Sequence, residues 1–134
     1  MTKEFIVPKN QYKSGRAYTP AIRFDDGVSE TIYIPGLLPK DAEGKVVGIG
    51  DIEAQARCVF DKMIAILEEA GADLNDLVKV NMYLVHFERD FEKVSAVRNE
   101  YLMESRPAAT TVGITATATP GCDIEIDAVA MKRK

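Results

Sequence analysis

The stretch SRPAATTVGI, from Ser105 to Ile114, combines residue types that could hold a small anion. A guanidinium binds a carboxylate through two parallel hydrogen bonds, and threonine hydroxyls can donate further ones. The cation here is Arg106, which stands directly before Pro107 and is followed by two alanines. Because a cationic side chain near a helix end readily bonds the last carbonyl groups, we expect Arg106 to cap a preceding helix. The rest of the chain must then show whether another group binds an anion beside this stretch.

Metal and nucleotide chemistry find little support in the sequence. Cys58 and Cys122 do not form a Cys-x-x-Cys pair, and His86 is the single histidine. Zinc would require the fold to gather these three residues and to add a fourth ligand, and no spacing motif predicts that arrangement. Gly48-Ile49-Gly50 is an incomplete glycine pattern without a phosphate-binding lysine after it, so we interpret it as the lead-in to a helix. We expect two free thiols in a reducing cytoplasm and no metal site.

The composition is that of a globular protein with one domain, residues 1–134. Apolar residues make up 46% of the chain, charged residues make up 28%, and the formal net charge is −4. Basic residues cluster only in the tail Lys132-Arg133-Lys134, which we interpret as a solvated terminus. Nucleic-acid binding normally requires clustered lysine and arginine, so we expect no nucleic-acid partner. The sequence shows neither a secretory signal nor a membrane span, so we expect a cytoplasmic protein that does not contact the membrane.

Hydrophobic periodicity and turn residues predict the elements that position these groups. The strand from Asp76 to His86 alternates, with Val78, Val80, Met82 and Leu84 on one face. The element order is β-β-α-β-α-β-β, which predicts an α+β fold with a mixed sheet and two helices on one face. The expected elements are strands at Ala21–Phe24 and Thr31–Ile34 around a turn at 25–27, a helix at Ile52–Ala70 capped by Asp51, the strand Asp76–His86, a helix at Phe91–Glu104 capped by Asp90, and strands at Thr110–Ala116 and Cys122–Met131.

The second face of this sheet is too apolar for open water. Valine, isoleucine and tyrosine occur at or beside its outward positions, at Tyr83, Val85, Val112, Ile114 and Val129. An apolar sheet face without a cover usually contacts a partner, and closed homo-oligomers are the common solution. We therefore expect the chain to associate with copies of itself.

Several short motifs follow one another along nearly the whole chain. They are Ala17-Tyr18-Thr19-Pro20-Ala21, Ile34-Pro35-Gly36 followed by Pro39, Gly50-Asp51-Ile52-Glu53-Ala54-Gln55, the run from Leu74 to Leu84, Asp90-Phe91, Pro107-Ala108, and Ile124-Glu125-Ile126 before Ala128-Val129-Ala130. In this order and spacing they make the chain resemble the YjgF/RidA family, also known as the L-PSP endoribonucleases. No single motif carries the resemblance, which rests on all of them together.

The resemblance implies a chorismate-mutase-like α+β fold assembled as a homotrimer, with the sheets in a central barrel, the helices outside and clefts between subunits. The best characterised members hydrolyse imines and enamines, such as 2-iminopropanoate, to a keto acid and ammonia without a metal or organic cofactor. The chain would then be a 2-iminobutanoate/2-iminopropanoate deaminase-like hydrolase. The alternative is a trimer that binds a small metabolite without catalysis. We do not expect ribonuclease activity, because the chain is acidic and no histidine or lysine pair stands near the cleft.

The resemblance also indicates site residues by position. Glu125 matches the family's acidic residue, which would position or activate water, and Tyr18 and Gly36 match residues that line the cleft. Ser95 stands where the family commonly has an asparagine. Each of the first three residues has a plain alternative, because Tyr18 could be a packed aromatic, Glu125 a solvated strand carboxylate and Gly36 part of a turn.

The chain departs from the family where the substrate carboxylate would bind. The family's arginine corresponds to Ala109, and its frequent cysteine corresponds to Thr111. Arg106 does not substitute, since three positions along a strand span roughly 10 Å and an odd spacing reverses the face. We hypothesise that Arg16, which would share a face with Tyr18, reaches the cleft from a neighbouring edge. The hydroxyl groups of Thr110 and Thr111 would be neutral partners, and the substrate preference would be altered.

Overall fold

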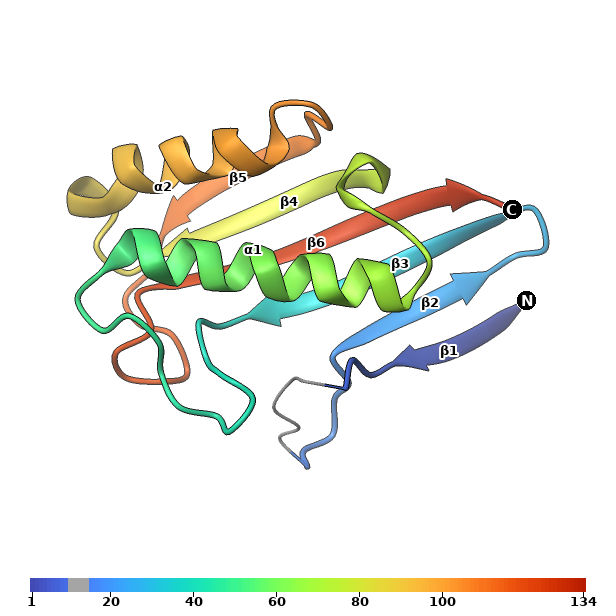
Figure 1. Cartoon of the computed structure of the whole chain (residues 1–134), viewed down its shortest axis with the longest axis horizontal. Coiled ribbons are helices and arrows are strands. Elements are labelled where there is room, and N and C mark those ends of the chain that lie inside the picture. The colour runs from blue at the N-terminus through green and yellow to red at the C-terminus, as the bar shows by residue number, and fades with distance from the viewer. Residues whose placement is uncertain (10–14) are drawn as a thin grey trace.

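The computed structural model describes residues 1–9 and 15–134, and these form one six-stranded sheet with two helices on one of its faces (Figure 1). The strand order is β1-β2-β3-β6-β4-β5. The β4–β5 pair is parallel and the other pairs are antiparallel, so the sheet is mixed. The elements are β1 (Thr2–Ile6), β2 (Ala21–Asp25), β3 (Ser29–Leu37), α1 (Ile52–Glu69), the 3₁₀ helix η1 (Leu74–Asp76), β4 (Leu77–Leu84), α2 (Phe87–Leu102), β5 (Ala108–Gly113) and β6 (Ile124–Arg133).

The predicted α+β class with two helices on one face is confirmed, and the structure adds one strand that the predicted order lacked. β1 pairs with β2 along the edge of the sheet. Its residues Thr2 to Phe5 are exposed, and only Ile6 is buried. An edge strand with so little buried surface has weak apolar alternation, which explains why the pattern did not reveal it.

Helix α1 supplies most of the apolar surface that covers the sheet. Asp51 caps it as predicted, accepting a hydrogen bond from the Ala54 backbone amide at 3.1 Å. At the opposite end Arg23 donates to the Ala70 carbonyl and Lys132 donates to the Gly71 carbonyl. Cations at a helix C-terminus satisfy its free carbonyls and oppose the negative end of its dipole. The inward side chains are fully buried, among them Ala56, Val59, Phe60, Met63, Ile66 and Leu67.

Helix α2 begins four residues earlier than predicted, at Phe87 and not at Phe91. The N-cap is His86, and Asp90 lies in the first turn with 2% of its surface exposed. Phe87 stacks on Phe91 with the ring centroids 4.9 Å apart, which extends the apolar period by one turn. The Asp90 carboxylate accepts two hydrogen bonds from Arg89 at 2.8 Å and is therefore not free to cap the helix. None of the described helices is long and apolar enough to cross a membrane.

Strand β4 contains an irregularity that corrects the predicted alternation. Leu77 pairs with Ala130 while Lys79 pairs with Val129, so Val78 is an extra residue in the ladder. Leu77 is consequently buried and Val78 is 43% exposed, contrary to the predicted inward position of Val78. Beyond this bulge Val80, Met82 and Leu84 point inward as expected.

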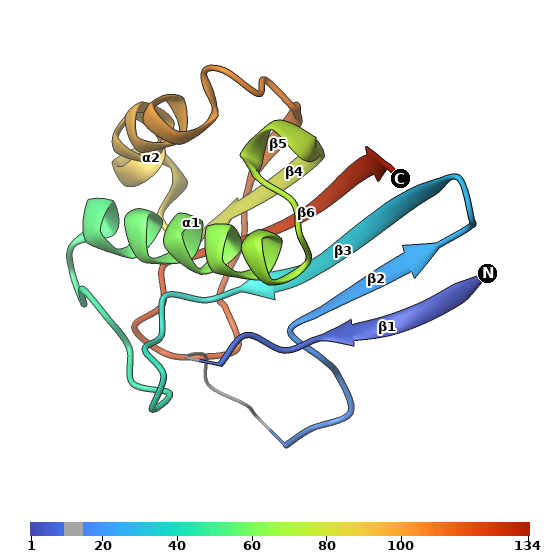
Figure 2. The same ribbon diagram turned by 45° about the vertical axis from the view of Figure 1, so that its right-hand side comes forward.

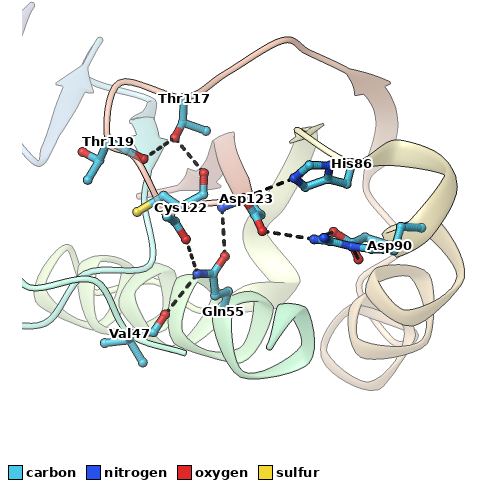
Figure 3. Close-up of polar contacts among 10 residues, drawn as sticks. Val47, Gln55, His86, Asp90, Thr117, Thr119, Cys122 and Asp123 are labelled. Carbon is cyan, nitrogen blue, oxygen red and sulfur yellow. Dashed lines mark hydrogen bonds and ion pairs between the residues drawn. The ribbon is translucent and has the colours of Figure 1, made fainter. Parts of the chain in front are cut away.

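Gln55 holds the loops at one end of the sheet against α1 (Figure 3). Its side chain is 1% exposed. The amide nitrogen donates to the Val47 carbonyl at 3.2 Å and to the Gly121 carbonyl at 2.7 Å, and the amide oxygen accepts from the Asp123 backbone N–H at 2.9 Å. One side chain thus connects α1 with two loops and with the start of β6.

Replacing Gln55 with leucine should destabilise the protein strongly. The apolar side chain fills a similar volume but leaves two partly buried carbonyls and one partly buried amide without their partner, and each such group costs about 1–3 kcal/mol when it is desolvated. We expect Gln55→Leu to lose about 3 kcal/mol or more in urea unfolding, whereas Glu68→Leu on the exposed side of α1 changes stability by about 0.5 kcal/mol or less. Equal stability of the two variants would contradict this role of Gln55.

Candidate functional site

The face of the sheet opposite the helices contains an apolar half and a polar half. Figure 2 shows both helices on the same side, and no described helix covers the other side. Phe5, Ile22, Tyr33 and Val129 are successive cross-strand partners on β1, β2, β3 and β6, so they form one apolar row on this open face. Phe5 is 63% exposed and Tyr33 is 52% exposed. The predicted surplus of apolar surface is therefore present on the open face.

The polar half lies where β6 meets β4. Asp127 is opposite Asn81, and Glu125 is opposite Tyr83. The Asn81 amide donates to Asp127 Oδ1 at 2.8 Å, and the Tyr83 hydroxyl donates to Asp127 Oδ2 at 2.7 Å. The hydrogen bond to Asp127 and partial burial raise the pKa of Tyr83, so the phenol remains a donor at neutral pH. Two carboxylates, an amide and a phenol thus share one face.

Glu125 lies against the backbone of Gly36 on β3. A Cβ atom at position 36 would come within 2.8 Å of Glu125 Cδ and 3.0 Å of Oε2, so only glycine leaves room for this carboxylate. Pro35 and Gly36 stand at a break in the register between Ile34 and Leu37, which brings the Gly36 backbone up to β6. Burial, and next the charge of Asp127, raise the pKa of Glu125. The structure therefore brings Glu125 and Gly36 together, with the carboxyl group partly desolvated.

The residues predicted on β5 divide between the two faces of the sheet. Thr110 is on the open face, where Lys79 Nζ donates to its Oγ1 at 2.9 Å. Ala109 pairs with Val80 and Thr111 pairs with Met82, both of which face the helices. Side chains paired across parallel strands share a face, so Ala109 and Thr111 point away from the face that carries Glu125. Within one subunit, an arginine at position 109 would not be on the same face as Glu125.

The other predicted residues lie on other segments of the chain than Glu125. Ser95 is half-buried on α2, in the helix layer on the opposite side of the sheet. Tyr18 is 66% exposed in the segment before β2, and Arg16 is exposed two residues earlier. β3 lies between β2 and β6 in the sheet. Arg106 has the predicted capping role, with its Nε donating to the Met103 carbonyl at 3.0 Å at the end of α2.

Two surface hollows of the subunit lie elsewhere. One, of about 400 Å³, is lined by residues at the start of α1 and in the first two turns of α2, including Asp51, Arg89 and Lys93. Another lies beside α1 and is lined by Lys40, Lys62 and other residues. Neither contains a predicted site residue. The polar half of the open face lines neither of these two hollows.

The cysteines and the histidine do not assemble a metal centre. Cys58 and Cys122 are free thiols, as predicted, and burial raises the pKa of both. His86 Nε2 lies 3.9 Å from Asp123 Oδ1, on the helix side of the sheet (Figure 3). In the described part of the chain no three His, Cys, Asp or Glu side chains are close enough to hold a metal ion.

Comparison with known proteins decides the family. The family model described as Endoribonuclease L-PSP matches residues 9–132. The chain belongs to the L-PSP family. This agrees with the fold, because the sheet with two helices on one face is shared with solved L-PSP structures. One of these is RidA from the Antarctic bacterium Psychrobacter, which is 30% identical, has a TM-score of 0.83 and is matched over 95% of this chain and 98% of that chain.

Relatives of known name place deaminases in the L-PSP family. A RutC family protein of Pyrococcus abyssi is 39% identical over 98% of this chain and 99% of that protein. The 3-aminoacrylate deaminase RutC of Acinetobacter baylyi is 34% identical over 97% and 98%. The 2-iminobutanoate/2-iminopropanoate deaminase of Dermatophagoides farinae is 30% identical over 78% and 80%. A deaminase-type role is thus supported at the level of the family.

Sequence reasoning missed the environment of Glu125. Glu125 and Asp127 alternate with buried residues along β6, and Asn81 and Tyr83 do so along β4. The signal for a cluster was therefore present on each strand. No pattern within either strand could show that β6 pairs with β4, because this contact joins residues more than 40 positions apart.

The raised pKa of Glu125 predicts a pH-dependent effect on stability. Folding disfavours the charged form of the Glu125 carboxyl group. The resulting loss of folding stability is absent below the pKa that Glu125 has in the unfolded chain, and it appears as pH rises through the pKa of the folded state. Glu125→Gln should therefore raise Tm at pH 8, and the gain should shrink toward pH 4. Glu92→Gln, at an exposed position of α2, serves as the control. A gain of the same size at both pH values would contradict the assignment.

Proposed function

We propose that the protein is a hydrolase of a small imine or enamine acid that acts at clefts between the subunits of a homotrimer. The observation that carries the proposal is the Glu125 carboxyl, partly desolvated and lying against the Gly36 backbone in a member of a family that includes deaminases. A carboxylate in such a position can accept a proton from water as the water attacks an electrophilic carbon.

The reaction needs one water molecule and no redox step. An enamine first gains a proton at carbon and becomes the iminium, the N-protonated imine. Glu125 accepts a proton from water while the water oxygen bonds to the iminium carbon, which gives a neutral carbinolamine. Glu125 returns that proton to the nitrogen, the C–N bond breaks and ammonia leaves, and the hydroxyl group loses its proton to solvent to leave a carbonyl group. Gly36 keeps space for the carboxylate, and Tyr18 of a neighbouring subunit would donate a hydrogen bond to the substrate.

The proposed substrate preference follows from the groups that surround the site. Where the resemblance implies an arginine, this chain has Ala109, on the face away from Glu125. The cation on the open face of β4 is Lys79, which is bonded to Thr110. A single ammonium and a hydroxyl bind a carboxylate less specifically than a bidentate guanidinium. The substrate carboxylate would therefore be bound differently or be absent, and Arg16 of a neighbouring edge is a second candidate partner.

The test is hydrolysis of 2-iminopropanoate and 3-aminoacrylate generated in situ. We expect the wild type to exceed the spontaneous rate, and Glu125→Gln to lose about 10²-fold or more, as is typical for a general base. Gly36→Ala should lose activity with only a modest loss of stability, since its Cβ displaces the end of the flexible Glu125 side chain. Glu92→Gln is the matched control.

Two outcomes would contradict this function. No rate in the wild type together with a rate in Ala109→Arg would show that the natural chain is not an ordinary imine deaminase. Saturable binding of the keto acid by calorimetry without turnover would favour the alternative, a trimer that binds a small metabolite.

The trimer is tested separately by light scattering after gel filtration. We expect a mass of three times the 14.8 kDa chain, because the apolar row around Tyr33 needs a cover. Tyr33→Glu should shift the mass toward the monomer, while the exposed helix variant Glu92→Gln should not. A monomeric wild type at micromolar concentration would remove the proposed cleft.

A further inference from the structure

We propose that Asn81 and Tyr83 hold Asp127 as a fixed negative charge beside Glu125, so that Glu125 is the carboxyl group of the pair that exchanges protons. This makes Asp127, Asn81 and Tyr83 positioning residues of the proposed site. The inference rests on the proposed function for its catalytic meaning, but the pair itself can be measured without any substrate.

The two carboxylates are neighbours through the geometry of β6. Positions 125 and 127 lie on the same face of the strand, with Ile126 buried between them on the other face. Residues two apart on a strand are separated by about 6.6 Å along its axis. Charges at such a spacing interact appreciably where the surroundings are partly desolvated.

The surroundings of the two carboxylates differ. Each oxygen of Asp127 accepts one hydrogen bond, from Asn81 at 2.8 Å and from Tyr83 at 2.7 Å. Hydrogen bonds to an ionised carboxylate favour the ionised form. No described side chain donates a hydrogen bond to Glu125, and its carboxyl group lies against the backbone of Gly36. Desolvation and the charge of Asp127 both raise the pKa of Glu125.

The groups that face Glu125 reinforce this asymmetry. On β3 its neighbours are Pro35 and Gly36, which carry no charge. On β4 its direct partner is Tyr83, whose proton is engaged by Asp127. Asp123, which precedes β6, is paired with Arg89. The cation of β4 on this face is Lys79, whose ammonium is bonded to Thr110 on β5, three strands from Gly36.

An asymmetric pair of this kind suits a reaction that uses one group first as a base and then as an acid. Glu125 takes a proton from the attacking water, and the same proton is delivered to nitrogen before ammonia leaves. A carboxyl whose pKa lies nearer the working pH performs both transfers better than an ordinary surface carboxylate. Asp127 does not exchange protons in this scheme, and its charge keeps the proton affinity of Glu125 high.

The experiment is a carbon-detected NMR titration of the Glu125 carboxyl in the wild type, Asp127→Asn and Tyr83→Phe, with Glu92→Gln as control. Removing the charge in Asp127→Asn should lower the pKa of Glu125. The acidic limb of kcat/KM should move to lower pH by the same amount. In Tyr83→Phe the Asp127 carboxylate loses one donor but keeps its charge, so the Glu125 titration should shift less than in Asp127→Asn. The control should leave the Glu125 titration unchanged.

The outcomes separate this inference from the proposed function. An unchanged Glu125 titration in folded Asp127→Asn, checked by circular dichroism, overturns the inference whatever the activity. A shifted titration without any hydrolysis in the wild type supports the carboxylate pair and overturns the proposed reaction. A shifted titration with an unmoved acidic limb in an active enzyme overturns the role of Glu125 in proton exchange.

Discussion

The pairing of β6 between β3 and β4 is the constraint on which the rest of the structure depends. The last strand of the chain occupies the middle of the sheet and is antiparallel to both neighbours. Its alternation places Ile124, Ile126, Ala128 and Ala130 under the helices and Glu125, Asp127 and Val129 on the open face. A slip by one residue would put two carboxylates into the core, so burial of the isoleucines fixes the register. The position of Glu125 therefore follows from the packing of its buried neighbours.

The same strand links the core to the candidate site near its start. Where β6 begins, Gln55 of α1 binds the Asp123 backbone and the Gly121 carbonyl, which ties the incoming loop to the helix. Where β6 passes β3, the register break at Pro35 and Gly36 brings a backbone without a side chain against Glu125. A buried amide and a missing Cβ thus position one carboxyl group. Neither feature carries charge, and neither resembles a catalytic motif by itself.

The division of the open face explains why the single subunit looks incomplete. Its apolar row would be unfavourable in water, and its polar half has no wall above it. A second copy of the chain placed over this face would bury the apolar row and enclose the polar half. The desolvation that raises the pKa of Glu125 would then increase. Gly36 and Thr110 share this face with Glu125, whereas Ser95, Ala109 and Thr111 lie on the other side of the sheet and Tyr18 lies in the segment before β2.

Much of the fold could be predicted, because it rests on local patterns. The cap at Asp51, the hairpin at 25–27, the alternation of β4 and β6 and the stop after Arg106 all depend on residues close in sequence. The errors have local causes as well. Because Phe87 stacks on Phe91, α2 starts earlier than predicted. Because Val78 forms a bulge, Leu77 is buried where Val78 was expected to be. Edge strand β1 buries too little apolar surface to show a hydrophobic alternation in the sequence.

The sequence by itself determined the family, the layer of two helices on a mixed sheet, and the candidates Glu125 and Gly36, because motif order and hydrophobic period are properties of the chain. Tertiary structure alone decided which of these side chains meet. It placed Glu125 against Gly36, gave Asp127 two donors from β4, and turned Ala109 away from that face. The physical reason is that burial of the whole sheet sets the strand order and the register. No single segment of the sequence contains the information on that burial.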